Sequence, residues 1–359
     1  MTTVTRELGR EGASGPDYRP KPQQRFLALD TMRGVAILMV VFGHFLPDRI
    51  VFGQLAHHVT SLGRGGVLLF FLLSGYLIFR NVERQDTAIF LSRRVFKIFP
   101  AYSINVALIF LLGLFTAEHE NWNLKLLLAN LFMVQDIFGQ DLLNGVFWTL
   151  LIEIKFYAFI ALQYLILRDR GTVVIPLVLI AINTAIWLTR GYASLLLTFF
   201  PTFYVGIQIY RAERRNWDRT ETLTACGMVA AVALSLFFFD SQYGGWSVIY
   251  LTVESALLAL FLRHDISSRL LNFFGRVSYS DYLYHASFGY LIFALIGSAT
   301  SRSGNLASVI LVIALTTVVA YISFRLIEVP MVAFGKVHEP LLISSIKRVR
   351  AKLGLLNQA

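Results

Sequence analysis

The sequence predicts an all-α protein, a polytopic membrane helix bundle of about ten transmembrane helices. Of its 359 residues, 56% are hydrophobic and only 15% are charged, whereas soluble domains carry about 25% charged residues. The mean hydropathy is +0.62. The apolar residues are gathered into runs of about 20, the length that a helix needs to cross a bilayer. These observations exclude a soluble globular core.

Ten apolar segments qualify as predicted spans, and the second of them is short. Segment 124–134 is too short to cross and is expected to lie at the interface or to re-enter. We find no internal repeat and no domain linker, so residues 25–335 are expected to form one membrane domain. Residues 1–24 are expected to be a flexible cytosolic tail without a cleavable signal peptide. Residues 336–359 are expected to be a second cytosolic tail. The predicted spans are residues 26–46, 65–80, 99–116, 146–167, 172–189, 193–210, 222–239, 246–262, 276–297 and 306–328.

The distribution of basic residues predicts the orientation. On the side of the N-terminus lie 24 of the 32 Lys and Arg residues, against 5 on the opposite side. Cytosolic loops are the ones enriched in Lys and Arg, so both termini are expected in the cytosol. The net charge of +10 is thereby interpreted as a topology signal, and nucleic-acid binding is not expected.

The first span contains charged groups that are costly in lipid and therefore mark candidate functional sites. Arg33 and His44 are eleven positions apart, close to three full helical turns, so they share one helix face about 16 Å apart. Asp30 lies one turn before Arg33 and could form a local ion pair with it. His44 has the structural alternative of a packing hydrogen bonder, and the Asp30–Arg33 pair that of a surface topology signal.

Spans four and nine add further polar groups within apolar sequence. Glu153 and Tyr157 are four residues apart and face the same way, while Trp148 lies near the outer interface, where a lipid-belt role is its alternative. Span nine begins with Tyr279 close to its start and places a second histidine, His285, about two turns in. We expect Trp148, Tyr157, Tyr279 and His285 to contact substrate.

The strongest basic cluster precedes span three. Arg93, Arg94 and Lys97 lie on an amphipathic cytosolic stretch that could anchor lipid headgroups or clamp a phosphate. Other chemistries lack their motifs: there is no phosphate-binding Gly-rich loop, no nucleophile elbow and no zinc-protease motif. The single cysteine, Cys226, excludes an intramolecular disulfide and is expected to be a small core residue. The remaining histidines do not predict a metal site.

Six segments in order resemble the membrane-bound acyltransferase 3 family, the O-acyltransferases of bacterial surface glycans. They spread over about 300 residues and are LDTMRGVAILMVVFGH (29–44), FFLLSGYLI (70–78), FLSRRVFKIFPAY (90–102), FWTLLIEIKFY (147–157), FGRVSYSDYLYH (274–285) and SFRLIEVP (323–330). The family's ten-helix topology with cytosolic termini agrees with the charge distribution.

The resemblance implies transfer of an acyl group, usually acetyl, from acyl-coenzyme A to a hydroxyl of a surface or exported glycan, in the bacterial cytoplasmic (inner) membrane. The family's arginine-x10-histidine motif falls on Arg33 and His44, which makes His44 the expected catalytic base or, alternatively, the site of an acyl-histidine. Its arginine-x-x-arginine motif falls on Arg94 and Lys97, where lysine keeps the charge but loses the bidentate fork.

The expected mechanism places the coenzyme A phosphates at the cytosolic mouth against Arg93, Arg94 and Lys97, with Arg33 below them. Glu153, rather than Asp30, is expected to orient His44 because Asp30 lies beside Arg33. The expected partners are acyl-coenzyme A, a glycan or lipid-linked oligosaccharide and membrane lipids; no cofactor is expected to be permanently bound.

Other functions remain open from the sequence. A transporter of glycan precursors would also place His, Arg and Glu inside the membrane, although it predicts inverted repeats that we do not find. A structural subunit of a glycan-export complex is a third alternative. Among enzymes, O-acylation of a small molecule or a lipid is the alternative to a glycan acceptor.

Overall fold

The structure, a computed structural model, consists of helices joined by turns and loops, with no strand among the residues that it describes, which are 27–50, 54–115, 122–297 and 302–352. The predicted tail 1–24 lies outside them. Within these ranges the helices are α1 (Leu27–Arg49), α2 (Gln54–Arg84), α3 (Thr87–Gly113), α4 (Leu124–Leu131), α5 (Phe147–Leu167), α6 (Val174–Arg190), α7 (Leu195–Arg214), α8 (Arg219–Phe239), α9 (Gly244–His264), α10 (Arg269–Ile296), α11 (Arg302–Ser323), a π-helical turn (Phe324–Glu328) and α12 (Val329–Lys352).

Every predicted span coincides with a helix, and the all-α membrane character is confirmed. Seven helical stretches are long and apolar enough to cross a bilayer: α1, α2, α3, α5, α8, α9 and the run from α11 into α12. The apolar helix α6 is shorter, and α4 has only 8 residues, as expected for a segment that does not span. The count of ten and the cytosolic termini remain predictions.

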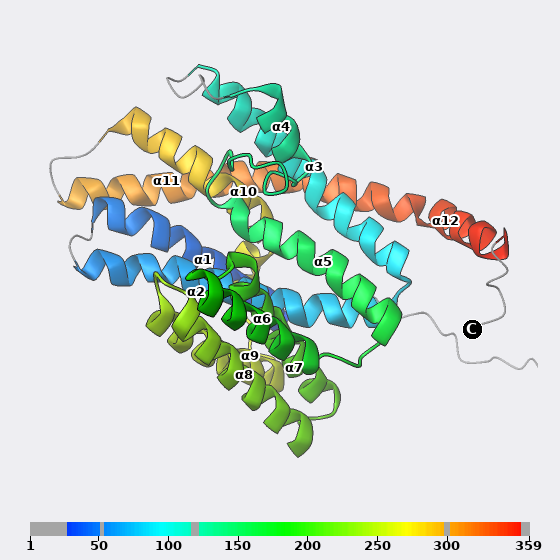
Figure 1. The fold of residues 1–359 in the computed structure, drawn as a ribbon. Helices are drawn as coiled ribbons and strands as arrows, with labels where there is room; N and C mark the ends of the chain where they lie inside the picture. Colours follow the sequence, from blue (N-terminus) through cyan, green and yellow to red (C-terminus); the bar gives the residue numbers. More distant parts are fainter. Residues whose placement is uncertain (1–26, 51–53, 116–121, 298–301, 353–359) are drawn as a thin grey trace, which may run out of the picture.

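The central pair of helices is α1 and α2. They pack along each other, with α10 against α1 and α7 against α2, while α8 and α9 follow α7 and α11 follows α10 (Figure 1). The interior between α2, α5 and α7 is aromatic: Phe156 stacks on Phe203 with ring centroids 4.1 Å apart, and Phe203 meets Phe71 at 4.6 Å. Burying such rings supplies much of the packing energy that holds α5 in place.

Two helices extend beyond their predicted ends. The second starts at Gln54 rather than at 65, so residues that the sequence assigned to a loop, Arg64 among them, lie inside α2. The third starts at Thr87, so the basic segment with Arg93, Arg94 and Lys97 is a helix whose turns face different neighbours. Cys226, expected in the core, is exposed on α8.

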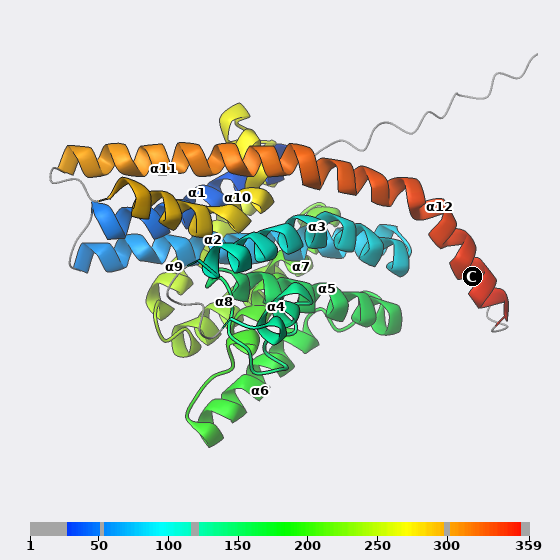
Figure 2. The ribbon, with the colours of Figure 1, turned by 90° about the horizontal axis from the view of Figure 1, so that it is seen from above.

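The sequence predicts that the last span ends at residue 328, but the helical structure continues beyond it. The chain continues as α12, which with α11 forms a long bent rod lying along α3 (Figure 2). The π turn explains the continuity: the N–H of Val329 bonds to the carbonyl of Phe324, five residues back, and Pro330 falls in the first turn of α12, where a missing N–H is tolerated. Much of the predicted tail 336–359 is therefore helical, to Lys352.

Glycine sets the distance between α1 and α10. A Cβ atom added to Gly275 would lie 1.9 Å from the backbone carbonyl oxygen of Asp30, and one added to Gly34 would lie 2.1 Å from that of Leu271. Small residues of this kind let helix backbones approach closely in membranes. The close approach matters for function because α1 and α10 carry several of the candidate site residues.

We expect Gly275→Ala to destabilise the protein by about 1–3 kcal/mol, because overpacking against a backbone atom forces the helices apart. The measurement is the melting temperature in detergent. Gly227→Ala is the matched control: Gly227 lies exposed on α8 with nothing within 4 Å of an added Cβ. An equal effect of the two substitutions would contradict the role of Gly275 in the α1–α10 contact.

Candidate active site

Two cavities open inside the bundle, and they meet at two shared residues. The large cavity, of about 710 Å³, is lined by His44, Arg64 and Trp148 together with residues of α3, α10 and the turn before α9. The small cavity, of about 60 Å³, lies between α1, α2, α3, α5 and α10. Val67 and Tyr282 line both. The two cavities are therefore neighbours, and these two side chains belong to the wall of each.

The small cavity gathers the cations that the sequence singled out. Arg33 from α1 and Arg94 and Lys97 from α3 line it, opposed by a single lining carboxylate, Glu153 from α5. The Nε atoms of Arg33 and Arg94 are buried and have no hydrogen-bond partner among the described residues. Three cations against one carboxylate in a low-dielectric interior favour an anionic ligand.

Neighbouring side chains hold the lining groups of the small cavity in position. Glu153 accepts hydrogen bonds from Ser74 of α2 and from the Tyr157 hydroxyl, at 2.5 Å. The guanidinium of Arg94 lies 5.9 Å from the Tyr157 ring centroid, within the range of a cation–π contact. Tyr279 donates a hydrogen bond to the Ile98 carbonyl at 2.7 Å, which ties α10 to α3. The polar groups are therefore fixed by contacts between four helices.

His44 lines the large cavity in one defined tautomer. Its Nδ1 lies 2.8 Å from the Val40 carbonyl oxygen, one turn earlier on α1. Because a carbonyl can only accept, Nδ1 must carry the proton, and in the neutral ring Nε2 then holds the lone pair. A histidine in this state can act as a general base, and its orientation comes from its own helix.

His285 packs against His44 rather than lining a cavity. Its ring is fully buried, and the two ring centroids are 5.0 Å apart. Its Nδ1 lies 2.9 Å from the Tyr282 carbonyl oxygen, so its Nε2 also bears the lone pair. The expected contact of His285 with substrate is therefore not supported by the lining of either cavity.

The structure separates two groups that the sequence analysis had joined. Glu153 lines the small cavity and His44 the large one. The structure therefore does not show the expected pairing of Glu153 with His44. The alternative, Asp30, lies fourteen positions before His44 on α1, about 21 Å along the axis. A backbone carbonyl takes the orienting role instead.

Arg93 also lies apart from the other cations. Its guanidinium donates two hydrogen bonds, of 2.7 and 2.8 Å, to the carboxylate of Glu339 on α12 and a third to Gln85. Consecutive helical residues point about 100° apart, so Arg94 faces the small cavity while its neighbour faces α12. The expected coenzyme-binding residues Arg33, Arg94 and Lys97 are thus brought together without Arg93.

The match to a family model decides which proteins this chain resembles. The model of an acyltransferase domain matches residues 26–325, nearly the whole of the described bundle and both cavities. The chain belongs to the acyltransferase 3 family. Its membership places it among enzymes that transfer acyl groups other than aminoacyl groups.

Two similar proteins carry related names. An O-acetyl transferase of Shigella phage Sf6 is 30% identical over 174 residues, covering 43% of this chain and 51% of that protein. A putative acetyltransferase, ORF330, of Acidianus two-tailed virus is 24% identical over 271 residues, 71% of this chain and 80% of that protein. The match with the phage protein thus spans about half its length. No solved structure matches the chain.

One cluster of this acyltransferase family member was missed by the sequence analysis. Arg64, with its side chain only 10% exposed, pairs with Asp240 at 3.2 Å and also donates to Gln242. Its guanidinium lies 5.2 Å from the Trp148 ring centroid and 4.7 Å from that of Phe199. Arg64 thereby joins α2, α5 and α7 to the turn after α8 and fixes Trp148 at the wall of the large cavity.

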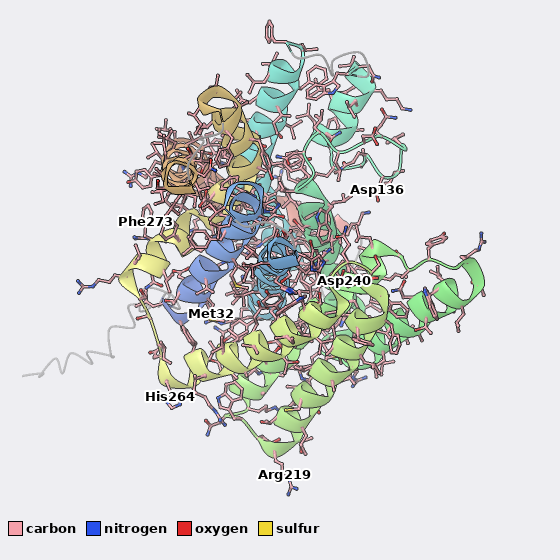
Figure 3. All side chains as sticks on the ribbon, turned by 90° about the vertical axis from the view of Figure 1, so that its left-hand side faces the viewer. Met32, Asp136, Arg219, Asp240, His264 and Phe273 are labelled. Carbon is pink, nitrogen blue, oxygen red and sulfur yellow. The ribbon has the colours of Figure 1, made fainter. Side chains whose placement is uncertain are left out.

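Figure 3 shows where Asp240, the partner of Arg64, lies in the bundle. Asp240 lies beside the central helices, whereas Arg219, at the other end of α8, lies at the edge of the bundle. Asp240 ends α8 and accepts a 2.6 Å hydrogen bond from Ser247 of α9. The sequence contained a signal for this ion pair. Asp240 directly follows one apolar run and Arg64 directly precedes another, so the two opposite charges lie at the edges of predicted spans.

Proposed function

We propose that this protein transfers an acyl group, acetyl in the first instance, from acyl-coenzyme A to a hydroxyl of a surface or exported glycan. The observation that supports the proposal is the adjacency of the two cavities, of which the small one is lined by three cations and one carboxylate and the large one by the oriented histidine His44. An anionic donor and a neutral hydroxyl acceptor match these two cavities.

In the proposed reaction the donor approaches from the small cavity. Arg33, Arg94 and Lys97 attract the negatively charged donor, as preorganised cations do in phosphate sites. A cavity of about 60 Å³ is far below the roughly 300–1,000 Å³ of a site for a drug-sized ligand. The adenosine therefore stays outside it, the negatively charged phosphates lie at its mouth against these cations, and the thioester end of the donor is the part that advances.

The acceptor occupies the large cavity, where His44 and aromatic side chains such as Trp148 and Tyr243 meet. The acceptor oxygen bonds to the acyl carbon while its proton passes to Nε2 of His44. The carbon–sulfur bond breaks, and the leaving thiolate takes the proton from the imidazolium. The products are the acyl ester and free coenzyme A, and His44 returns to its neutral tautomer.

The location follows from the predicted orientation. With both termini in the cytosol, Arg33 and the small cavity face the cytosolic pool of acyl-coenzyme A, and the large cavity faces outward. We propose the bacterial cytoplasmic membrane as the site and a glycan or lipid-linked oligosaccharide as the acceptor. The support is the aromatic lining of the large cavity, because aromatic faces with a few polar groups are typical of binding sites for uncharged ligands.

A reconstituted system tests the proposal. Purified protein in sealed vesicles is given labelled acetyl-coenzyme A on the side of its termini and lipid-linked oligosaccharides, extracted from the source cells, on the other. We expect release of free coenzyme A together with label in the oligosaccharide. Movement of oligosaccharide across the bilayer without thiol release would indicate a transporter, and label retained on the protein would indicate an acyl-histidine.

A further inference from the structure

The two cavities meet at a junction formed by Val67 and Tyr282. Tyr282 of α10 reaches across to α5, where its hydroxyl donates to the Val146 carbonyl at 3.1 Å and lies 2.5 Å from the Thr149 hydroxyl. Val67 of α2 is 7% exposed and also lines both cavities. The junction is therefore formed by side chains from two helices, and one of them is anchored to a third.

Neighbouring side chains and rotamer preference restrict the movement of Tyr282 and Val67. The Tyr282 ring meets Phe70 with a centroid separation of 6.0 Å and His285 with one of 5.6 Å. Val67 is β-branched, so in a helix its side chain is held in one strongly preferred rotamer. These contacts restrict how far the two side chains can move apart.

The volume of the small cavity limits the size of the donor group that can reach the junction. Its volume is about 60 Å³ against about 710 Å³ for the large cavity. Under the proposed function, the thioester carbon must come from the small cavity to the junction before an acceptor activated by His44 can attack it. Every further carbon of the acyl chain then has to be placed against Val67 and Tyr282.

We propose that Val67 and Tyr282 form an acyl-length filter that admits acetyl and rejects longer acyl groups. This inference rests on the proposed function and adds the donor class that the site accepts. One methylene too many in a hydrophobic pocket changes kcat/KM by roughly 10–200-fold. Wild-type protein is therefore expected to prefer acetyl- over propionyl-coenzyme A within that range and to use butyryl-coenzyme A less still.

The test is the ratio of kcat/KM values for acetyl-, propionyl- and butyryl-coenzyme A, measured by thiol release with the oligosaccharide acceptor described above. Val67→Ala removes two methyl groups from the junction and should shift the propionyl-to-acetyl ratio by about tenfold or more toward propionyl. The single cysteine, Cys226, contributes a constant background of one thiol per chain.

Val82→Ala is the matched control. Val82 lies on the same helix and is fully buried, but it lines neither cavity, so the same loss of two methyl groups should leave the ratio unchanged. Should Val67→Ala not accumulate, Tyr282→Phe tests the filter instead, because it keeps the ring but removes the anchoring hydroxyl and should also relax the ratio.

The outcomes separate this inference from the proposed function. Intact acetyl transfer with equal use of the three donors, or equal ratios in Val67→Ala and Val82→Ala, overturns the filter alone. Absence of any acyl-coenzyme A-dependent turnover in the wild type overturns the proposed function and the filter with it. A relaxed ratio confined to the junction variants establishes the filter.

Discussion

Replacing His44 with alanine should reduce acyl transfer by about 10²–10⁴-fold, the usual contribution of a general base, while the protein still inserts and still binds the donor. His44→Gln should be nearly as inactive, because its amide can hydrogen-bond but cannot take up a proton at neutral pH. The measurement is the initial rate of thiol release with saturating acetyl-coenzyme A.

A histidine elsewhere in the chain provides a close control. His338 on α12 makes the same local bond, from its Nδ1 to the carbonyl oxygen of Phe334 four residues earlier, at 2.9 Å, but it is exposed. His338→Gln should retain full activity. If His44 only packs against its neighbours, His44→Gln should be tolerated and His44→Ala should be unstable. An active His44→Gln enzyme would contradict the role of His44 as the base, and His285 would be the next residue to test.

Replacing Arg94 with alanine should raise the KM for acetyl-coenzyme A by about tenfold to a hundredfold, because a hydrogen bond to a charged group is worth about 1.5–3 kcal/mol. The neighbouring substitution Arg93→Ala removes the same charge from the same helix. Since Arg93 is committed to Glu339, this variant should keep the KM of the wild type. Steady-state kinetics over a range of donor concentrations measure both.

The reverse order, a larger effect for Arg93 than for Arg94, would contradict the assignment of the small cavity as the donor site. Unchanged donor kinetics in both variants would leave the basic segment as a lipid-headgroup anchor. The ionic strength of the assay adds a further distinction, because salt screens buried charges less than exposed ones. Donor binding that depends on Arg94 should therefore weaken only moderately as salt rises.

The helices of the fold were predictable because each apolar run is close to the length that a helix needs to cross a bilayer. The start of α2 was not, since His57, His58 and Arg64 lower the hydropathy of its first turns. These residues are tolerated because they lie exposed or find distant partners: Arg64 is paired with Asp240, 176 positions later in the chain. A local reading of hydropathy has no access to such a partner.

The candidate site was predictable in composition and less so in arrangement. The face shared by Arg33 and His44 follows from helical periodicity, and both residues line cavities as that face requires. The choice between Arg93 and Arg94 could not be made, because it depends on where α12 packs. The separation of Glu153 from His44 likewise depends on the relative heights of α1 and α5.

The bond between His44 and the Val40 carbonyl has a consequence for how this enzyme can diversify. A base that relies on a carboxylate from another helix constrains two parts of the chain to evolve together. Here the tautomer is set within five consecutive residues of α1, and the walls of the large cavity come from other helices and turns. Under the proposed function, substitutions in those walls would alter which hydroxyl is presented while the proton-accepting nitrogen stays where it is, so new acceptors could be acquired with the same catalytic base.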